Sequence, residues 1–132
     1  MSETQTKVLV IEDDVTMREI VVHKLTTNGF AVVEAADGKS AIETWKKEKP
    51  DIVLLDLMLP ETDGFQILET VRKSADGDPN KASVMVLSNL FGKEDIKRAK
   101  DLNIDDFLVK AYYTTEEILS KVKEAVKKRG KK

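Results

Sequence analysis

The chain has 132 residues, of which 41% are hydrophobic and 35% are charged, and its formal net charge is −2. This length suits one domain with its own core, and the near balance of charge offers no global attraction to nucleic acid or to a membrane surface. Because the chain contains no cysteine, disulfides, thiolate catalysis and cysteine-ligated zinc are excluded. No apolar stretch approaches the roughly 20 residues of a membrane-spanning helix, so we expect a cytoplasmic protein.

Short apolar runs predict the strands of the fold. They are rich in valine, isoleucine and leucine and do not alternate with polar residues, which is typical of strands buried on both faces. The runs are residues 8–11, 52–55, 84–87 and 107–109, with Ala31–Val33 as a further strand.

Helical patterns lie between these runs. Apolar residues recur at helical spacing around Met17–Leu25, Ala41–Trp45, Phe65–Val71, Ile96–Ala99 and Ile118–Val126. Asp14 or Thr16 would cap the first helix and Asp37 the second, which must end before Pro50. Strands and helices therefore alternate, and right-handed crossovers predict an α/β fold with a doubly wound parallel sheet covered by helices on both faces.

We expect the chain to consist of one domain with short ends. Residues 1–6 are predicted to be a disordered N-terminal tail, residues 7–128 the domain, and residues 129–132 a basic C-terminal tail. The polar segment Ala75–Lys81 predicts a surface loop between the third helix and the fourth strand.

Polar residues suited to phosphate chemistry follow the apolar runs. Glu12 and Asp13 follow the first run, Asp56 the second, Ser88 the third and Lys110 the last. Because the carboxyl ends of parallel strands meet at one edge of a sheet, we expect these side chains to converge. Carboxylates held close together raise one another's pKa unless a cation neutralises them, and Mg²⁺ prefers such hard oxygen ligands. The pattern therefore indicates a site for a divalent metal and a phosphoryl group.

Taken together, these motifs resemble the receiver domain of two-component response regulators. The resemblance extends from about Lys7 to Lys128, and its motifs are Val10–Asp14, Asp56–Gly64, Ser88 and Asp105–Lys110. It implies a (βα)5 domain with the flavodoxin-like strand order 2-1-3-4-5. It also implies a stand-alone regulator of the chemotaxis type, acting as a phosphorylation-controlled signalling switch.

The resemblance implies a phosphoacceptor and a set of metal ligands. Asp56 would accept a phosphoryl group from the phosphohistidine of a sensor histidine kinase or a phosphotransfer protein. Mg²⁺ would be the cofactor, with Mn²⁺ as an alternative cation. Asp13 would be a direct metal ligand and Glu12 a water-bridged one, while Asp56 and the backbone carbonyl of Met58 complete the set.

The remaining implied roles concern the phosphoryl group and the signal. Lys110 would pair with the carboxylate and then with phosphoryl oxygens, offsetting charge in the transition state. The Ser88 hydroxyl would move to the phosphoryl group, and Phe107 would turn inward behind it. The chain would turn over no external substrate and would catalyse only its own phosphorylation and dephosphorylation. A downstream protein would bind the face of the fourth helix, fifth strand and fifth helix, with no direct contact to nucleic acid or membrane.

Some residues depart from the family pattern. The family usually follows the lysine with proline through a cis peptide, whereas Ala111 follows Lys110 here and leaves the peptide geometry open. Asn89 occupies a position where a small residue is usual and is predicted to narrow the mouth of the site. Leu90 and Met58 occupy positions that in the family flank the path of the attacking water. Both are apolar here, which predicts slow self-dephosphorylation.

Other functions compete with this hypothesis. In a flavodoxin-like electron carrier of the same architecture, the acidic segment Glu12–Asp14 would repel the phosphate of the cofactor. A metal-dependent phosphohydrolase of the commonest type has an aspartate two residues after the nucleophile, where this chain has Met58. A receiver-shaped binding module, its phosphorylation weakened or lost through Asn89 and Ala111, stays open as the alternative.

Overall fold

Parallel strands form a single sheet at the centre of the molecule. The computed structural model describes residues 5–59, 62–73, 82–89 and 92–130. Within these residues the sheet has five strands in the order β2-β1-β3-β4-β5. They are β1 (Lys7–Ile11), β2 (Ala31–Ala35), β3 (Ile52–Leu55), β4 (Ser83–Ser88) and β5 (Asp106–Val109). The predicted doubly wound fold and its strand order are thereby confirmed.

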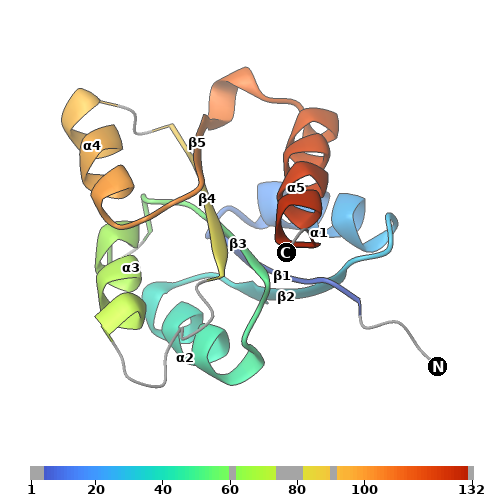
Figure 1. Ribbon diagram of the computed structural model, residues 1–132, viewed down its shortest axis with the longest axis horizontal. Coiled ribbons are helices and arrows are strands. Elements are labelled where there is room, and N and C mark those ends of the chain that lie inside the picture. Colours follow the sequence, from blue (N-terminus) through green and yellow to red (C-terminus); the bar gives the residue numbers. More distant parts are fainter. Residues whose placement is uncertain (1–4, 60–61, 74–81, 90–91, 131–132) are drawn as a thin grey trace.

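Helices cover both faces of the sheet, as Figure 1 shows. They are α1 (Val15–Thr26), α2 (Gly38–Glu48), α3 (Gly64–Lys73), α4 (Lys93–Asp101) and α5 (Thr115–Gly130), and a short 3₁₀ turn, η1 (Lys110–Tyr112), follows β5. Helices α1 and α5 pack on one face, and α2, α3 and α4 pack on the other (Figure 1). No helix among the described residues is both long and apolar enough to cross a membrane.

Side chains accept hydrogen bonds at the starts of the first two helices. Asp14 accepts a hydrogen bond from the N–H of Met17, so this residue, and not Thr16, is the N-cap of α1. Asp37 caps α2 in the same way, through the N–H of Ser40. These caps place the start of each helix directly beyond the end of a strand, at the edge of the sheet where the predicted site lies.

The inner strands contribute to two apolar cores. Val8 and Val10 of β1 belong to the core under α1 and α5, whereas Leu9 and Ile11 belong to the core under α2, α3 and α4. Because successive side chains of a strand point to opposite faces, an unbroken apolar run is what a strand between two helical layers requires.

The ends of the domain lie close to the amino edge of the sheet. Helix α5 continues past residue 128, the expected end of the domain, and Arg129 donates a hydrogen bond to the Ser83 hydroxyl at 3.3 Å. At the other end, the side chain of Gln5 donates to the carbonyl of Gly29 at 3.0 Å. Residues 1–4 and the predicted loop at 75–81 lie outside the described residues.

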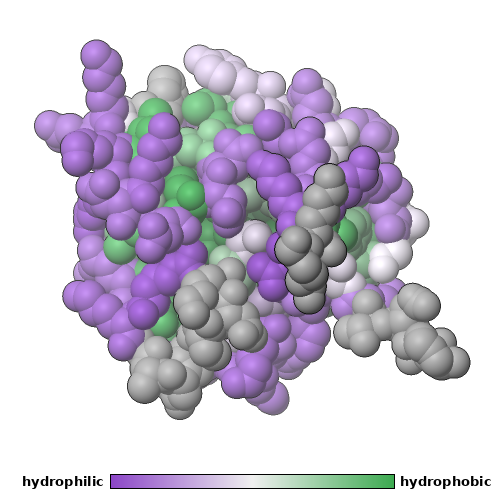
Figure 2. Space-filling model, in the orientation of Figure 1, coloured by the Kyte–Doolittle hydropathy of each residue, from purple (hydrophilic) through white to green (hydrophobic). Residues whose placement is uncertain are grey.

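The face of the molecule in Figure 2 is largely hydrophilic, and apolar side chains gather on it between α4 and β5. Tyr112, in the turn η1 that follows β5, is 70% exposed.

Candidate functional site

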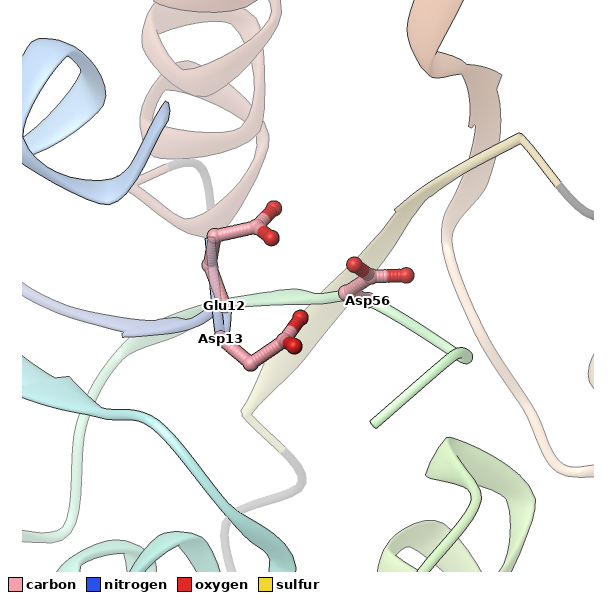
Figure 3. Close-up of side chains that lie close together, drawn as sticks. All are labelled: Glu12, Asp13 and Asp56. Carbon is pink, nitrogen blue, oxygen red and sulfur yellow. The ribbon is translucent and has the colours of Figure 1, made fainter. Parts of the chain in front are cut away.

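Acidic side chains meet where β1 and β3 end. Glu12 and Asp13 follow β1 and Asp56 follows β3, its neighbour in the sheet, and one carboxylate oxygen from each of the three lies within 4.8 Å of the others. Figure 3 shows the three carboxylates facing the same space at this edge. Glu12 is 4% exposed and Asp56 5%, whereas Asp13 is open to solvent. The cluster has the ligand type and the spacing to hold a metal ion, with Asp13 on the solvent side.

Lys110 contacts two of these carboxylates. Its Nζ lies 2.7 Å from Glu12 Oε1 and 2.9 Å from Asp56 Oδ2, so the side chain reaches from the end of β5 across β4 to the end of β3. Burial by itself would lower the pKa of Lys110, but the hydrogen bonds to Glu12 and Asp56 outweigh it and raise that pKa above its ordinary value. The ammonium therefore stays charged beside the carboxylates.

Glu12 is held in place on several sides. Its Oε2 accepts a hydrogen bond from the N–H of Asp14 at 3.1 Å, while Oε1 faces Lys110. Burial raises the pKa of Glu12, and the bonds to Lys110 and Asp14 oppose that rise. Arg18 donates to the main-chain oxygen of Glu12 at 2.8 Å and pairs with Glu34 of β2 at 3.1 Å. Arg18 was not predicted from the sequence. The only sequence signal for it is its position in the first turn of α1, shortly after Glu12 and Asp13.

Both carboxylate oxygens of Asp56 are engaged. Oδ2 faces Lys110, and Oδ1 accepts a hydrogen bond from the N–H of Met58 at 3.0 Å. The N–H of Asp56 itself donates to the carbonyl of Ile11 at 3.1 Å, which carries the β1–β3 pairing one residue past the strands. The carboxylate thus has a fixed orientation toward Lys110, Glu12 and the space that Asp13 borders.

The predicted switch residues, Ser88 and Phe107, lie on the adjacent strands β4 and β5. Ser88 is the last residue of β4, between β3 and β5, and its side chain is fully buried. Phe107 lies on β5 opposite Val86 and is partly buried against the core on the α2, α3 and α4 side. The structure therefore brings Ser88 to the same edge of the sheet as Asp56 and Lys110.

Ala111 follows Lys110 at the position where the family pattern has proline. The Lys110–Ala111 peptide is trans, and Lys110 begins the turn η1. Asn89 is exposed at the end of β4, while Leu90 lies outside the described residues. The trans peptide is compatible with the contacts of Lys110 to Glu12 and Asp56.

Residues 8–123 match the family described as the response regulator receiver domain. The chain belongs to this family. It is accordingly a phosphorylation-controlled signalling switch, as the sequence predicted, and histidine kinases or phosphotransfer proteins are the partners that a receiver domain implies.

Curated relatives extend beyond this chain. A probable transcriptional regulator, ycf27, of Guillardia theta is 30% identical over 129 residues, which are 98% of this chain and 48% of the relative. The transcriptional regulatory protein CseB of Streptomyces coelicolor is 35% identical over 108 residues, which are 82% of this chain and 44% of the relative. The chain thus spans about half the length of the curated relatives it matches.

Solved receiver structures are similar over almost their full length. The chemotaxis response regulator CheY4 of Vibrio cholerae superposes with a TM-score of 0.82 at 26% identity, covering 92% of this chain and 99% of that one. The receiver domain of the Francisella response regulator 1452 gives a TM-score of 0.82 at 29% identity, covering 95% and 99% of the two chains.

Proposed function

We propose that Asp56 is the phosphoacceptor of a Mg²⁺-dependent reaction with the phosphohistidine of a sensor histidine kinase or a phosphotransfer protein. An Asp56 carboxylate oxygen forms a bond to phosphorus, and the P–N bond to the donor histidine breaks with its electron pair going to the nitrogen. The observation that carries the proposal is the contact of Lys110 Nζ with Asp56 Oδ2 at 2.9 Å, inside the carboxylate cluster. A carboxylate so oriented is ready for an in-line attack.

The residues at the site fit a hard divalent cation. Asp13, Asp56 and the backbone carbonyl of Met58 would hold Mg²⁺ directly, with Mn²⁺ as an alternative cation. When bound, the cation supplies positive charge opposite the phosphoryl oxygens. Glu12 is engaged by Lys110 at 2.7 Å and by the N–H of Asp14, which supports a water-bridged role for this side chain.

The remaining residues act on the phosphoryl group during its transfer and after it is attached. Lys110 pairs with a phosphoryl oxygen and offsets the charge that develops during transfer. The Ser88 hydroxyl moves to a phosphoryl oxygen, and Phe107 turns inward behind it. Because phenylalanine has no hydroxyl, this switch signals by packing alone.

The proposed output surface is the face of α4, β5 and α5. The apolar side chains between α4 and β5 in Figure 2 and the exposed ring of Tyr112 support a protein partner there. A cytoplasmic location follows from the proposed kinase partner.

Labelling by a small phosphate donor tests the proposal. Incubation with acetyl phosphate and Mg²⁺ should add one phosphoryl group, a mass gain of about 80 Da, and chelation of Mg²⁺ or the change Asp56→Asn should abolish it. Asp63→Asn is the matched control, because Asp63 is an exposed carboxylate that accepts from the N–H of Gln66. Labelling that persists in Asp56→Asn would refute the acceptor, and a parent that takes up no phosphate would favour the binding module.

A further inference from the structure

The side chain of Asn89 joins the ends of β4 and β5. Main-chain pairing of these strands ends at Ser88 and Val109. Beyond it, Asn89 Oδ1 accepts a hydrogen bond from the N–H of Ala111 at 2.9 Å. Because a main-chain N–H can only donate, the atom of Asn89 that faces it must be the amide oxygen. The contact links the residue after Ser88 to the residue after Lys110.

The N–H of Ala111 needs an acceptor from outside its own turn. The turn η1 begins at Lys110, and the first N–H groups of a helical turn have no partner within it. Val109, in the N-cap position, has no polar side chain and makes no capping bond. Asn89 supplies that acceptor from the neighbouring strand. Proline, the usual family residue at position 111, has no N–H and could not donate this bond. The contact therefore requires both residues that depart from the family pattern, Asn89 as acceptor and Ala111 as donor.

We propose that Asn89 is a positioning residue that holds the main chain after Lys110 so that the ammonium lies between Glu12 and Asp56. This inference rests on the role proposed for Lys110 in phosphoryl transfer. The bond of the turn itself, from the N–H of Tyr113 to the carbonyl of Lys110, is long at 3.4 Å. The 2.9 Å bond from Ala111 to Asn89 is therefore the shorter restraint on this backbone.

Positioning and crowding predict opposite effects of shortening Asn89. If Asn89 only narrowed the mouth of the site, Asn89→Ala would admit the donor more easily and phosphorylation would become faster. If it positions Lys110, Asn89→Ala makes phosphorylation slower by about threefold to tenfold at saturating donor, the factor that one hydrogen bond contributes.

Amide hydrogen exchange measured by NMR tests the contact without any phosphorylation. The Ala111 amide should be protected in the parent and in Asn89→Asp, which keeps an acceptor oxygen, and should exchange rapidly in Asn89→Ala. Equal exchange in the parent and Asn89→Ala would overturn the inference. If the parent is never phosphorylated, the proposed function fails, whereas rapid Ala111 exchange in the parent would overturn the inference separately.

Phosphorylation rates with acetyl phosphate and Mg²⁺ complete the test. Asn89→Ala should slow the reaction in the parent background and have no effect in an Ala111→Pro background, which already lacks the N–H. Asn28→Ala is the matched control. Asn28 lies just past the C-terminal end of α1, and its side chain donates to the carbonyl of Lys24 in that helix. A rate in Asn89→Ala equal to or above that of the parent would overturn the positioning role.

Discussion

Gly64 lies so close to Asp56 that a Cβ atom at position 64 would come within 2.8 Å of the Asp56 main-chain oxygen. The Cα of Leu57 would be equally near. Both neighbours are main-chain atoms that cannot move aside as the end of a side chain can. The close approach lets the start of α3 pack against the backbone that carries the proposed phosphoacceptor.

We expect Gly64→Ala to lower the free energy of unfolding by about 1–3 kcal/mol, the usual cost of overpacking a rigid site, and to slow phosphorylation of Asp56. Urea unfolding followed by circular dichroism measures the first effect. Gly92→Ala is the control, because its nearest neighbour is the flexible Asp95 Oδ2 at 3.0 Å. Equal losses in both variants would contradict the explanation.

Mg²⁺ binding should depend more on Asp13 than on Glu12. Asp13 is exposed and would ligate directly, whereas Glu12 is occupied by Lys110. Loss of an outer partner of a metal site costs about tenfold or more in affinity, so we expect that order of loss for Glu12→Gln and a larger one for Asp13→Ala. Isothermal titration with MgCl₂ measures both, and an Asp13→Ala protein that binds as tightly as the parent would refute the ligand assignment.

Removal of the Lys110 ammonium should destabilise the metal-free protein at neutral pH. Lys110→Met leaves the side chains of Glu12 and Asp56, which are 5% and 6% exposed, without their cation. Breaking a fully buried pair costs about 3–5 kcal/mol, and because the Lys110 side chain is 18% exposed we expect about 2 kcal/mol.

The same variant should show a distinctive pH dependence. Burial raises the pKa of Glu12 above its ordinary value of 4.5, and without Lys110 that pKa rises further. A carboxyl with a raised pKa in the folded state loses stability as the pH rises through that pKa. The deficit of Lys110→Met should therefore be largest at neutral pH and shrink toward pH 4.5, as followed by urea midpoints in EDTA. Lys121→Met, whose partner Asp106 is partly exposed, should show no such trend.

The acyl phosphate should be long-lived. The Met58 side chain is 56% exposed beside Asp56 and offers no group to orient an attacking water. We expect slower loss of phosphate from the parent than from Met58→Asn after removal of the donor, as followed by intact mass. Leu90→Glu tests the companion position, which lies outside the described residues. If the parent loses phosphate as fast as the polar variants, the apolar side chains do not set the lifetime.

Local sequence signals predicted most of the fold. Neighbouring residues in the chain are enough to identify the apolar runs, the cap residues Asp14 and Asp37, and the polar residues that follow four of the runs. The sheet then brings the ends of those runs together. Local sequence signals did not predict which side chains contact each other across the fold. The family resemblance implied that Lys110 pairs with Asp56, but its second contact, with Glu12, depends on how far a lysine reaches over β4, and no spacing in the chain encodes it.

The contact of Asn89 with Ala111 shows the same limit. Each residue stood out alone as a departure from the family pattern, yet they are 22 positions apart and meet only because β4 and β5 are adjacent. Likewise, η1 was not predicted, because a single helical turn has too few residues to show a period.

The position of β3 in the middle of the sheet has a consequence for motion. Its residues Ile52 and Leu54 belong to one core, Val53 and Leu55 to the other, and all four are at most 2% exposed. A segment shared by both cores can open only when the domain as a whole unfolds, so its local fluctuations are small. Asp56 is therefore anchored to one of the least mobile segments of the chain. A conformational response to a modified Asp56 must therefore arise outside β3, as the movements proposed for Ser88 of β4 and Phe107 of β5 would.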